Sequence, residues 1–179
     1  MSQPDLRYPV GKYSRPKAVL SSAERGELID AIGQMPTKLR SAVKDLSEKQ
    51  LATPYRPDGW TVRQVVHHLA DSHMNAYIRF KFALTEDMPA VKPYDEAKWA
   101  ELIDGRSAPV AESLALLDAL HARWVMLLRA MTPSDFLRKL SHPEWDTPPD
   151  LDAMLAMYGW HSRHHTAHIT ELRKREGWA

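Results

Sequence analysis

The chain has 179 residues, a length at which one hydrophobic core buries most of the apolar surface, so we expect a single domain over residues 1–179. Lysine and arginine total 24 against 23 aspartates and glutamates, which leaves no overall field for a polyanion and excludes nucleic acid as an expected partner. The chain has no cysteine, no stretch near the roughly 18 apolar residues of a membrane span and no secretory signal pattern, so we expect a cytoplasmic protein without disulfides, thiolate ligands or membrane contacts.

The first predicted elements are an extended arm and a helix. Residues 1–20 are rich in proline and charge and have few periodic apolar positions, so we expect an arm that lies over the body of the protein. Ser21 and Glu24 have the spacing of a capping box, which predicts the start of a helix. Apolar periodicity carries this helix to about residues 45–47.

The second predicted helix begins at another capping box. Residues 53–60, TPYRPDGW, have the composition of a loop, and Thr61 is followed by Gln64 at the spacing of this motif. We expect the helix to run to about Leu84. Prolines then interrupt the pattern, and DEAKWAELID at 95–104 predicts a short surface helix inside a long crossover.

Two further helices complete the predicted architecture. Apolar periodicity predicts one over residues 110–131, which ends at Thr132 and Pro133, and another over about residues 151–176, followed by Gly177. We find no convincing strand and no internal repeat. Four long amphipathic helices with a long crossover between the second and the third predict an all-α fold, a four-helix bundle.

Most of the nine histidines fall in two clusters, VVHHLADSH in the second helix and HSRHHTAH in the fourth. His161 and His165 are four residues apart and project from one helix face, on a stripe that otherwise consists of apolar residues and His168. Buried imidazoles need partners, so histidines in register on such a stripe indicate one divalent transition metal ion. The alternative is a hydrogen-bonded structural cluster.

The other histidines of the fourth helix have different expected roles. His168 lies almost directly over His161 and His165, and it could be a ligand, a base near the ion or a donor that orients a ligand. His164 lies about 60° off the stripe, so we expect it to be a solvated surface imidazole.

A third ligand must come from another helix, and the candidates are His67, His68 and His73. Periodicity places His73 at the apolar centre of the second helix and His68 on its flank, whereas His67 points largely away. It slightly favours His73, but the polar flank that His68 shares suits a pocket wall, so spacing alone leaves both open. His121 and His142 stand alone in the sequence, and we expect them to be surface or packing residues.

Three blocks of the sequence resemble the YfiT branch of the DinB superfamily: TPYRPDGWTVRQVVHHLADSHMNAYIRFK, PYDEAKWAEL and WHSRHHTAHITEL. The similarity extends over nearly the whole chain and includes the opening DLRYPVGKY. It implies a four-helix bundle with a three-histidine metal site, a homodimer and a cytoplasmic location. The family's ligands are the second histidine of the HH pair and two histidines of the last helix, which in this sequence are His68, His161 and His165.

The resemblance also implies metal-dependent hydrolysis, although some members of the wider superfamily are thiol transferases that use bacillithiol or similar small thiols. Three neutral imidazoles leave the ion an open position, which suits either the activation of water or the binding of a thiol. Zinc is the expected ion and nickel the second candidate, because nitrogen ligands suit both. A third alternative is a non-catalytic stress protein in which the metal only ties two helices together.

We expect the enzyme to act on a small-molecule substrate. Four side chains are candidates for binding it or for orienting the ligands: Ser72, Asn75, Arg79 and His168. Arg79 could meet an anionic substrate group or form an ordinary ion pair. No carboxylate lies beside the histidines in the manner of an HExxH motif, which argues against peptidase chemistry.

Overall fold

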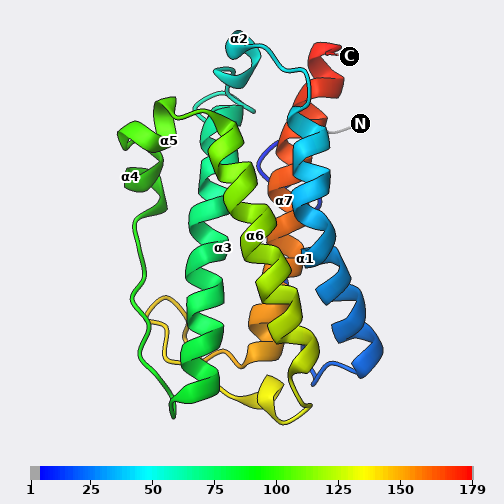
Figure 1. Ribbon diagram of the computed structural model, residues 1–179, viewed down its shortest axis with the longest axis vertical. Helices are drawn as coiled ribbons and strands as arrows, with labels where there is room; N and C mark the ends of the chain where they lie inside the picture. The colour runs from blue at the N-terminus through cyan, green and yellow to red at the C-terminus, as the bar shows by residue number, and fades with distance from the viewer. Residues whose placement is uncertain (1–4, 179) are drawn as a thin grey trace.

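The computed structural model describes residues 5–178. Four long helices form the bundle in Figure 1: α1 (Ser22–Val43), α3 (Val62–Thr85), α6 (Val110–Ala130) and α7 (Leu151–Glu176). Shorter helical segments lie in the connections: α2 (Glu48–Leu51), α4 (Glu96–Ala100), α5 (Ile103–Ser107) and the 3-10 turn η1 (Asp135–Leu137). The described residues form no named strand, and the predicted all-α four-helix bundle is confirmed. None of these helices is long and apolar enough to cross a membrane.

α3 and α6 run in the same direction, because the segment between them returns along the bundle (Figure 1). Contacts along the two helices keep the same order. Arg63 Nη1, near the start of α3, donates to the carbonyl of Ala108, just before α6, at 2.7 Å, and further along a ring nitrogen of His73 lies 2.9 Å from one of His121. The returning segment, residues 86–109, carries α4 and α5 beside α3. The predicted long crossover between the second and third long helices is therefore confirmed.

α1 and α7 also run in the same direction and pack closely. A Cβ atom at Gly159 would lie 2.6 Å from Leu28 Cδ2, so the absence of a side chain in α7 leaves room for this leucine of α1. Further along both helices, Arg173 Nη1 donates to the Ala42 carbonyl at 3.0 Å. This packing fixes the position of α7, the helix that carries four of the histidines.

Both predicted capping boxes begin their helices. The amide of Glu24 donates to the Ser21 hydroxyl at 3.3 Å, and the amide of Ser21 donates back to the Glu24 carboxylate at 2.8 Å. Thr61 and Gln64 make the equivalent pair of bonds at the start of α3. The first helix ends two to four residues before the predicted position, because Asp45 adopts a left-handed conformation with φ of 60°.

The predicted N-terminal arm lies along α7, as far as the structure describes it. Residues 1–4 of the predicted arm lie outside the described residues, whereas residues 5–20 contact the helix. The Tyr13 hydroxyl donates to the Ala153 carbonyl at 3.0 Å, and the Trp160 indole N–H donates to an arm carbonyl at 3.0 Å. The arm therefore covers a face of α7 that would otherwise meet solvent.

The histidine clusters lie between two apolar parts of the core. Along α3, Leu69 belongs to one cluster of buried side chains and Ala76 to the other. Along α7, Tyr158 and Ile169 belong to different clusters in the same way. His68 and His73 lie on either side of Leu69, near this boundary on α3, and all four histidines of α7 lie between Tyr158 and Ile169. The site is therefore inside the bundle and not at one of its ends.

A buried ion pair joins the starts of α1 and α7. Arg25 donates from Nε and Nη2 to the two carboxylate oxygens of Asp152, each at 2.7 Å, and the two side chains are 8% and 3% exposed. Asp152→Ala is expected to lower the free energy of unfolding by about 3–5 kcal/mol, because it leaves a buried guanidinium without its counter-ion. Equilibrium unfolding in urea measures this loss.

An exposed pair on the bundle surface is the matched control. Arg129 and Asp30 also join two helices at 2.6 Å, but their side chains are 58% and 55% exposed. Asp30→Ala is expected to cost less than about 1 kcal/mol, because solvent screens an exposed pair. Equal losses in the two variants would contradict a special role for the buried pair.

Candidate metal centre

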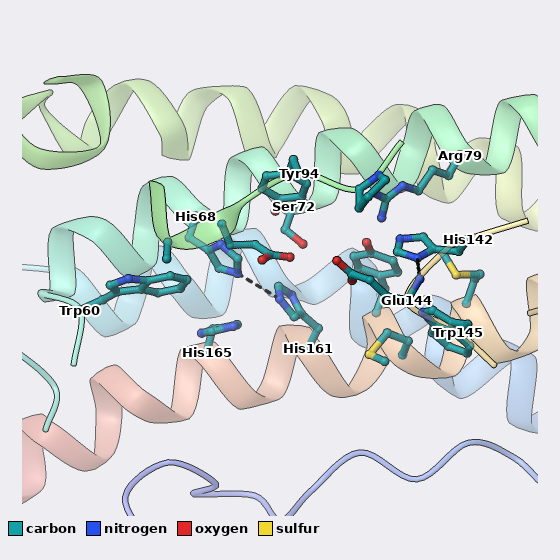
Figure 2. Close-up of a pocket in the computed structure, with 16 residues that line it drawn as sticks. Trp60, His68, Ser72, Arg79, Tyr94, His142, Glu144, Trp145, His161 and His165 are labelled. Carbon is teal, nitrogen blue, oxygen red and sulfur yellow. Dashed lines mark hydrogen bonds between the residues drawn. The ribbon is translucent and has the colours of Figure 1, made fainter. Parts of the chain in front are cut away.

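Three imidazoles from two helices converge inside the bundle. α3 supplies His68, and α7 supplies His161 and His165 one turn apart (Figure 2). One ring nitrogen from each lies within 4.8 Å of the others. The ring centroids of His68 are 5.3 Å and 4.8 Å from those of the two α7 histidines, which are 4.4 Å from each other.

The spacing of these nitrogens fits a divalent metal. Two nitrogens bound at about 2.0–2.1 Å to a tetrahedral ion lie roughly 3.3 Å apart. The Nε2 atoms of His68 and His161 are 3.3 Å apart, a distance that suits two ligands of one ion as well as a hydrogen bond between the two rings. The donor set and this distance both suit zinc and the related transition metals.

Burial keeps the three imidazoles neutral at pH 7. Removal from water, reinforced by the neighbouring histidines, lowers the pKa of His68 to about 4. The same two causes hold the pKa values of His161 and His165 well below the ordinary histidine value. A neutral ring has one nitrogen with a free lone pair, which is the form that binds a metal.

A chain of hydrogen bonds fixes which nitrogen of His161 carries the proton. The Ile32 carbonyl can only accept, so His121 donates to it from Nδ1 at 2.7 Å and accepts at Nε2. His73 must then donate from Nδ1 to His121 at 2.9 Å and accept at Nε2 from His161 Nδ1 at 3.1 Å. We call this chain the inner histidine relay, and it leaves the Nε2 lone pair of His161 free.

A second chain does the same for His165. The Arg7 carbonyl accepts from His168 Nε2 at 3.2 Å, so His168 Nδ1 is an acceptor. His165 Nδ1 lies 3.3 Å from it and must donate. This outer histidine relay leaves the Nε2 lone pair of His165 free, so a backbone carbonyl orients each α7 imidazole through other histidines, as is usual around metal ligands.

A second group of three histidine nitrogens also lies within 4.8 Å, formed by His164, His165 and His168. Both nitrogens of His168 are engaged in the outer relay. Of these three, only His165 lines the pocket described below, whereas all members of the first group do. The first group is therefore the better candidate for an ion that a substrate can reach.

The first group borders a cavity of about 400 Å³, which we call the histidine pocket. Its apolar walls include two tryptophans and two methionines: Trp60, Trp145, Met154 and Met157. Polar side chains line it as well: Ser72, Arg79, Tyr94, Glu96 and Glu144. Figure 2 shows Trp60 and His165 at one end and Arg79 and His142 at the other. The site is thus open to a small molecule on one side of the histidines.

A model of the DinB superfamily matches residues 31–169 of the chain. The chain belongs to the DinB superfamily. It is 50% identical over 179 residues to the protein named "Putative metal-dependent hydrolase YfiT" of Bacillus subtilis strain 168, with complete coverage of both chains. A Bacillus mycoides (strain KBAB4) protein with the same description is 52% identical over 174 residues, which cover 97% of this chain and 99% of the relative.

A solved structure is also similar to this one. YfiT from Bacillus subtilis superposes with a TM-score of 0.94 at 50% identity, covering 97% of this chain and 99% of that chain. That protein is described as a probable metal-dependent hydrolase with an unusual four-helix bundle topology. The same-direction pairs α1–α7 and α3–α6 are the feature of this fold that departs from a simple up-and-down bundle.

The predicted helper residues of this DinB chain have separate positions. Ser72 and Arg79 line the histidine pocket. Asn75 is not among its lining residues, and its amide donates to the Asp71 carbonyl at 2.9 Å. His168 lies behind His165, in the orienting position that was one of its three predicted roles.

His121 and His164, which were expected to be surface or packing residues, are both buried close to the site. His164 is only 6% exposed, so the prediction of a solvated imidazole is wrong. Its ring stacks on Trp160 at 4.2 Å, and Tyr8 of the arm covers it at 6.1 Å. His121 is a packing residue as predicted, but it does not stand alone, because it belongs to the inner relay.

The remaining histidines lie on either side of the site. His67 faces away from it, as predicted, with its ring nitrogens at 2.7 Å from the Ser113 hydroxyl and 3.1 Å from the Ala108 carbonyl. His142 is buried and lines the histidine pocket, where its Nδ1 accepts from the Glu144 amide at 3.3 Å.

Three polar residues of the pocket were not predicted from the sequence: Tyr94, Glu96 and Glu144. All of them come from the crossover or from the loop before α7, where no period indicates which side chains face inward. The two glutamates bring carboxylates to the pocket although none lies beside the histidines in the sequence. The block PYDEAKWAEL contains Tyr94 and Glu96, so its presence in the family pattern was the available signal.

Proposed function

We propose that this protein is a metal-dependent hydrolase of a small molecule, in which His68, His161 and His165 hold one divalent cation inside the histidine pocket. Zinc is the ion we propose first and nickel second, because the nitrogen donors suit both. The observation that carries the proposal is the approach of two Nε2 atoms to 3.3 Å at the edge of a cavity of about 400 Å³.

The side chains around the site have distinct tasks in this proposal. A divalent cation supplies a Lewis acid there, which activates water and polarises the bond to be cleaved. The two histidine relays keep the Nε2 atoms of His161 and His165 unprotonated and directed inward. Glu144 lines the pocket, and its side chain is directed toward the histidines in Figure 2, so we assign it to accept the proton of the attacking water.

Isotope transfer distinguishes hydrolysis from thiol transfer. The zinc-loaded or nickel-loaded protein is incubated with a panel of small esters, lactones and amides in water labelled with heavy oxygen, with and without a small thiol. We expect the label in the acid product, and no turnover by His161→Ala or by metal-free protein. Glu144→Gln is expected to keep the metal and lose about 10²–10⁴-fold in kcat.

Two results would count against hydrolysis. A product that carries the sulfur of the added thiol and no isotope label would establish group transfer instead. Equal turnover by wild type and His161→Ala would show that the three histidines do not carry the reaction.

A further inference from the structure

The histidine pocket contains a buried cation without a counter-ion. Arg79 is 8% exposed, and its Nη2 donates to the Lys92 carbonyl at 3.0 Å. Among residues 5–178, no carboxylate oxygen lies within 4.0 Å of its guanidinium. A guanidinium cannot lose its charge, and a buried charge is costly unless it is paired. This arginine therefore has the surroundings of a residue that receives its anion from outside the chain.

Three side chains with hydroxyl groups line the same cavity as this cation. Ser72 and Tyr158 line the same pocket as Arg79. Burial raises the pKa of Tyr158, and the positive charge of Arg79 opposes that rise. The buried Tyr94 hydroxyl has no hydrogen-bond partner in the described part of the chain, although Ser72 is near enough to lower its pKa against the effect of burial. All four residues line the histidine pocket. Together they offer an oxyanion one cation, the unpartnered hydroxyl of Tyr94 and the hydroxyls of Ser72 and Tyr158.

The other charged side chains of the pocket limit how many negative charges a bound ligand can carry. Glu96 and Glu144 are exposed at the pocket, so one buried cation is set against two carboxylates. In the protein without its metal, a second negative charge on the ligand would be repelled by them, and no second cationic side chain of the described residues lines the pocket to balance it. The arrangement favours a carboxylate over a doubly charged phosphate or phosphonate.

The rest of the lining suits an apolar or aromatic body. Trp60 and Trp145 belong to the walls together with two methionines, and small-molecule sites commonly combine such walls with a few polar groups. Arg79 lies at the end of the pocket away from Trp60 and His165 in Figure 2. A ligand anchored on Arg79 would therefore extend along the pocket toward the histidines.

We propose that the histidine pocket binds a small amphipathic monocarboxylate, with its carboxylate on Arg79, Tyr94 and Ser72 and its apolar body between the tryptophans. The inference rests on the proposed function only for the position of the cleaved bond, which would lie at the histidine end. Hydrolysis leaves the anchoring carboxylate unchanged, because the bond that breaks is at the other end of the molecule. The substrate class is thus an ester or amide that carries a second, free carboxylate.

Three ligands of nearly the same shape test the anchor: phenylacetate, neutral phenylacetamide and the dianion benzylphosphonate. Metal-free protein is used, so that no ligand can bind through an ion, and affinities are measured by ligand-observed NMR titration at about pH 9, where benzylphosphonate is a dianion and phenylacetate a monoanion. We expect phenylacetate to bind at least about tenfold more tightly than phenylacetamide, as a charge-assisted contact implies. Arg79→Gln should remove this preference and leave the affinity for phenylacetamide unchanged.

Two further variants make the test decisive. Arg129→Gln removes an exposed arginine that pairs with Asp30, and it should bind all three ligands as wild type does. Tyr94→Phe removes only a hydroxyl and should weaken phenylacetate binding several-fold, which keeps the test valid if Arg79→Gln unfolds. Equal binding of phenylacetate and phenylacetamide by wild type, or an unchanged preference in both Arg79→Gln and Tyr94→Phe, would overturn the proposal. Tighter binding of benzylphosphonate than of phenylacetate would overturn the choice of a monoanion.

The outcome is separable from that of the hydrolysis experiment. Selective carboxylate binding without any hydrolysis would leave this anchor in place and remove the proposed reaction. Metal-dependent hydrolysis of neutral esters without carboxylate selectivity would support the proposed reaction and remove the anchor.

Discussion

Alanine in place of His68, His161 or His165 is expected to abolish tight metal binding. Wild type should bind close to one zinc or nickel ion per chain, whereas each variant retains only two of the three imidazoles. Binding to the native state alone stabilises it by about 2.7 kcal/mol when the free ion is at a hundred times Kd. Excess zinc should therefore raise the Tm of wild type and leave the three variants unchanged. Metal content by mass spectrometry and thermal unfolding with and without zinc measure both effects.

His67→Ala is the matched control for these substitutions. His67 is also buried in α3, but its ring bonds to Ser113 and to the Ala108 carbonyl on the far side of the helix, so this variant should keep its metal. His73 is unsuitable as a control, because it touches His161. His164→Ala separates the two groups of three histidines. Metal lost in His164→Ala and kept in His68→Ala would contradict the proposed site.

The helices were predictable because local rules determine them. Two capping boxes mark where α1 and α3 begin, and their hydrogen bonds involve residues only three positions apart. The end of α1 was less predictable, since it depends on the left-handed conformation of Asp45, a residue that helices also tolerate. The long crossover followed from prolines that exclude one continuous helix between residues 85 and 110.

The roles of the histidines were only partly predictable. Periodicity placed His73 at the apolar centre of the helix and His68 on its flank, and both are buried. Periodicity could not tell a ligand ring, which faces His161 and His165, from a ring that only hydrogen-bonds to a ligand. The difference depends on the positions of Ile32 and His121 on other helices. The resemblance to the family selected His68, and the structure gives His73 a position behind His161.

Burial by irregular segments was not predictable from periodicity. His164 lies off the apolar stripe of α7, yet the arm covers it, because the arm follows that face of the helix through contacts such as the bond from the Trp160 indole. Tyr94, Glu96 and Glu144 reach the pocket from segments without a repeating pattern. A helical wheel describes one helix at a time, so it cannot show what a loop places against it.

His73→Phe is expected to weaken zinc binding by about 10–100-fold although His73 is not one of the three proposed ligands. Phenylalanine keeps a ring in the space between Trp124 and Tyr158, whose rings lie edge-on to His73 at 5.7 Å and 5.4 Å. It removes the acceptor that holds the proton on Nδ1 of His161. Part of the population can then carry the proton on Nε2, which takes away the lone pair needed by the ion. Competition with a coloured chelator measures the affinity, and nitrogen NMR of the imidazoles reports the tautomer.

Two variants separate this orienting role from simple packing. His67→Phe replaces another buried, hydrogen-bonded histidine of α3 and should bind zinc as wild type does. His73→Gln restores an acceptor toward His161 and a donor toward His121, so it should recover part of the affinity that His73→Phe loses. Wild-type affinity in His73→Phe, with the His161 proton still on Nδ1, would show that the inner relay only fills space. Loss in His73→Phe with recovery in His73→Gln requires the hydrogen bond itself, because a glutamine fills the space of the ring less well than a phenylalanine does.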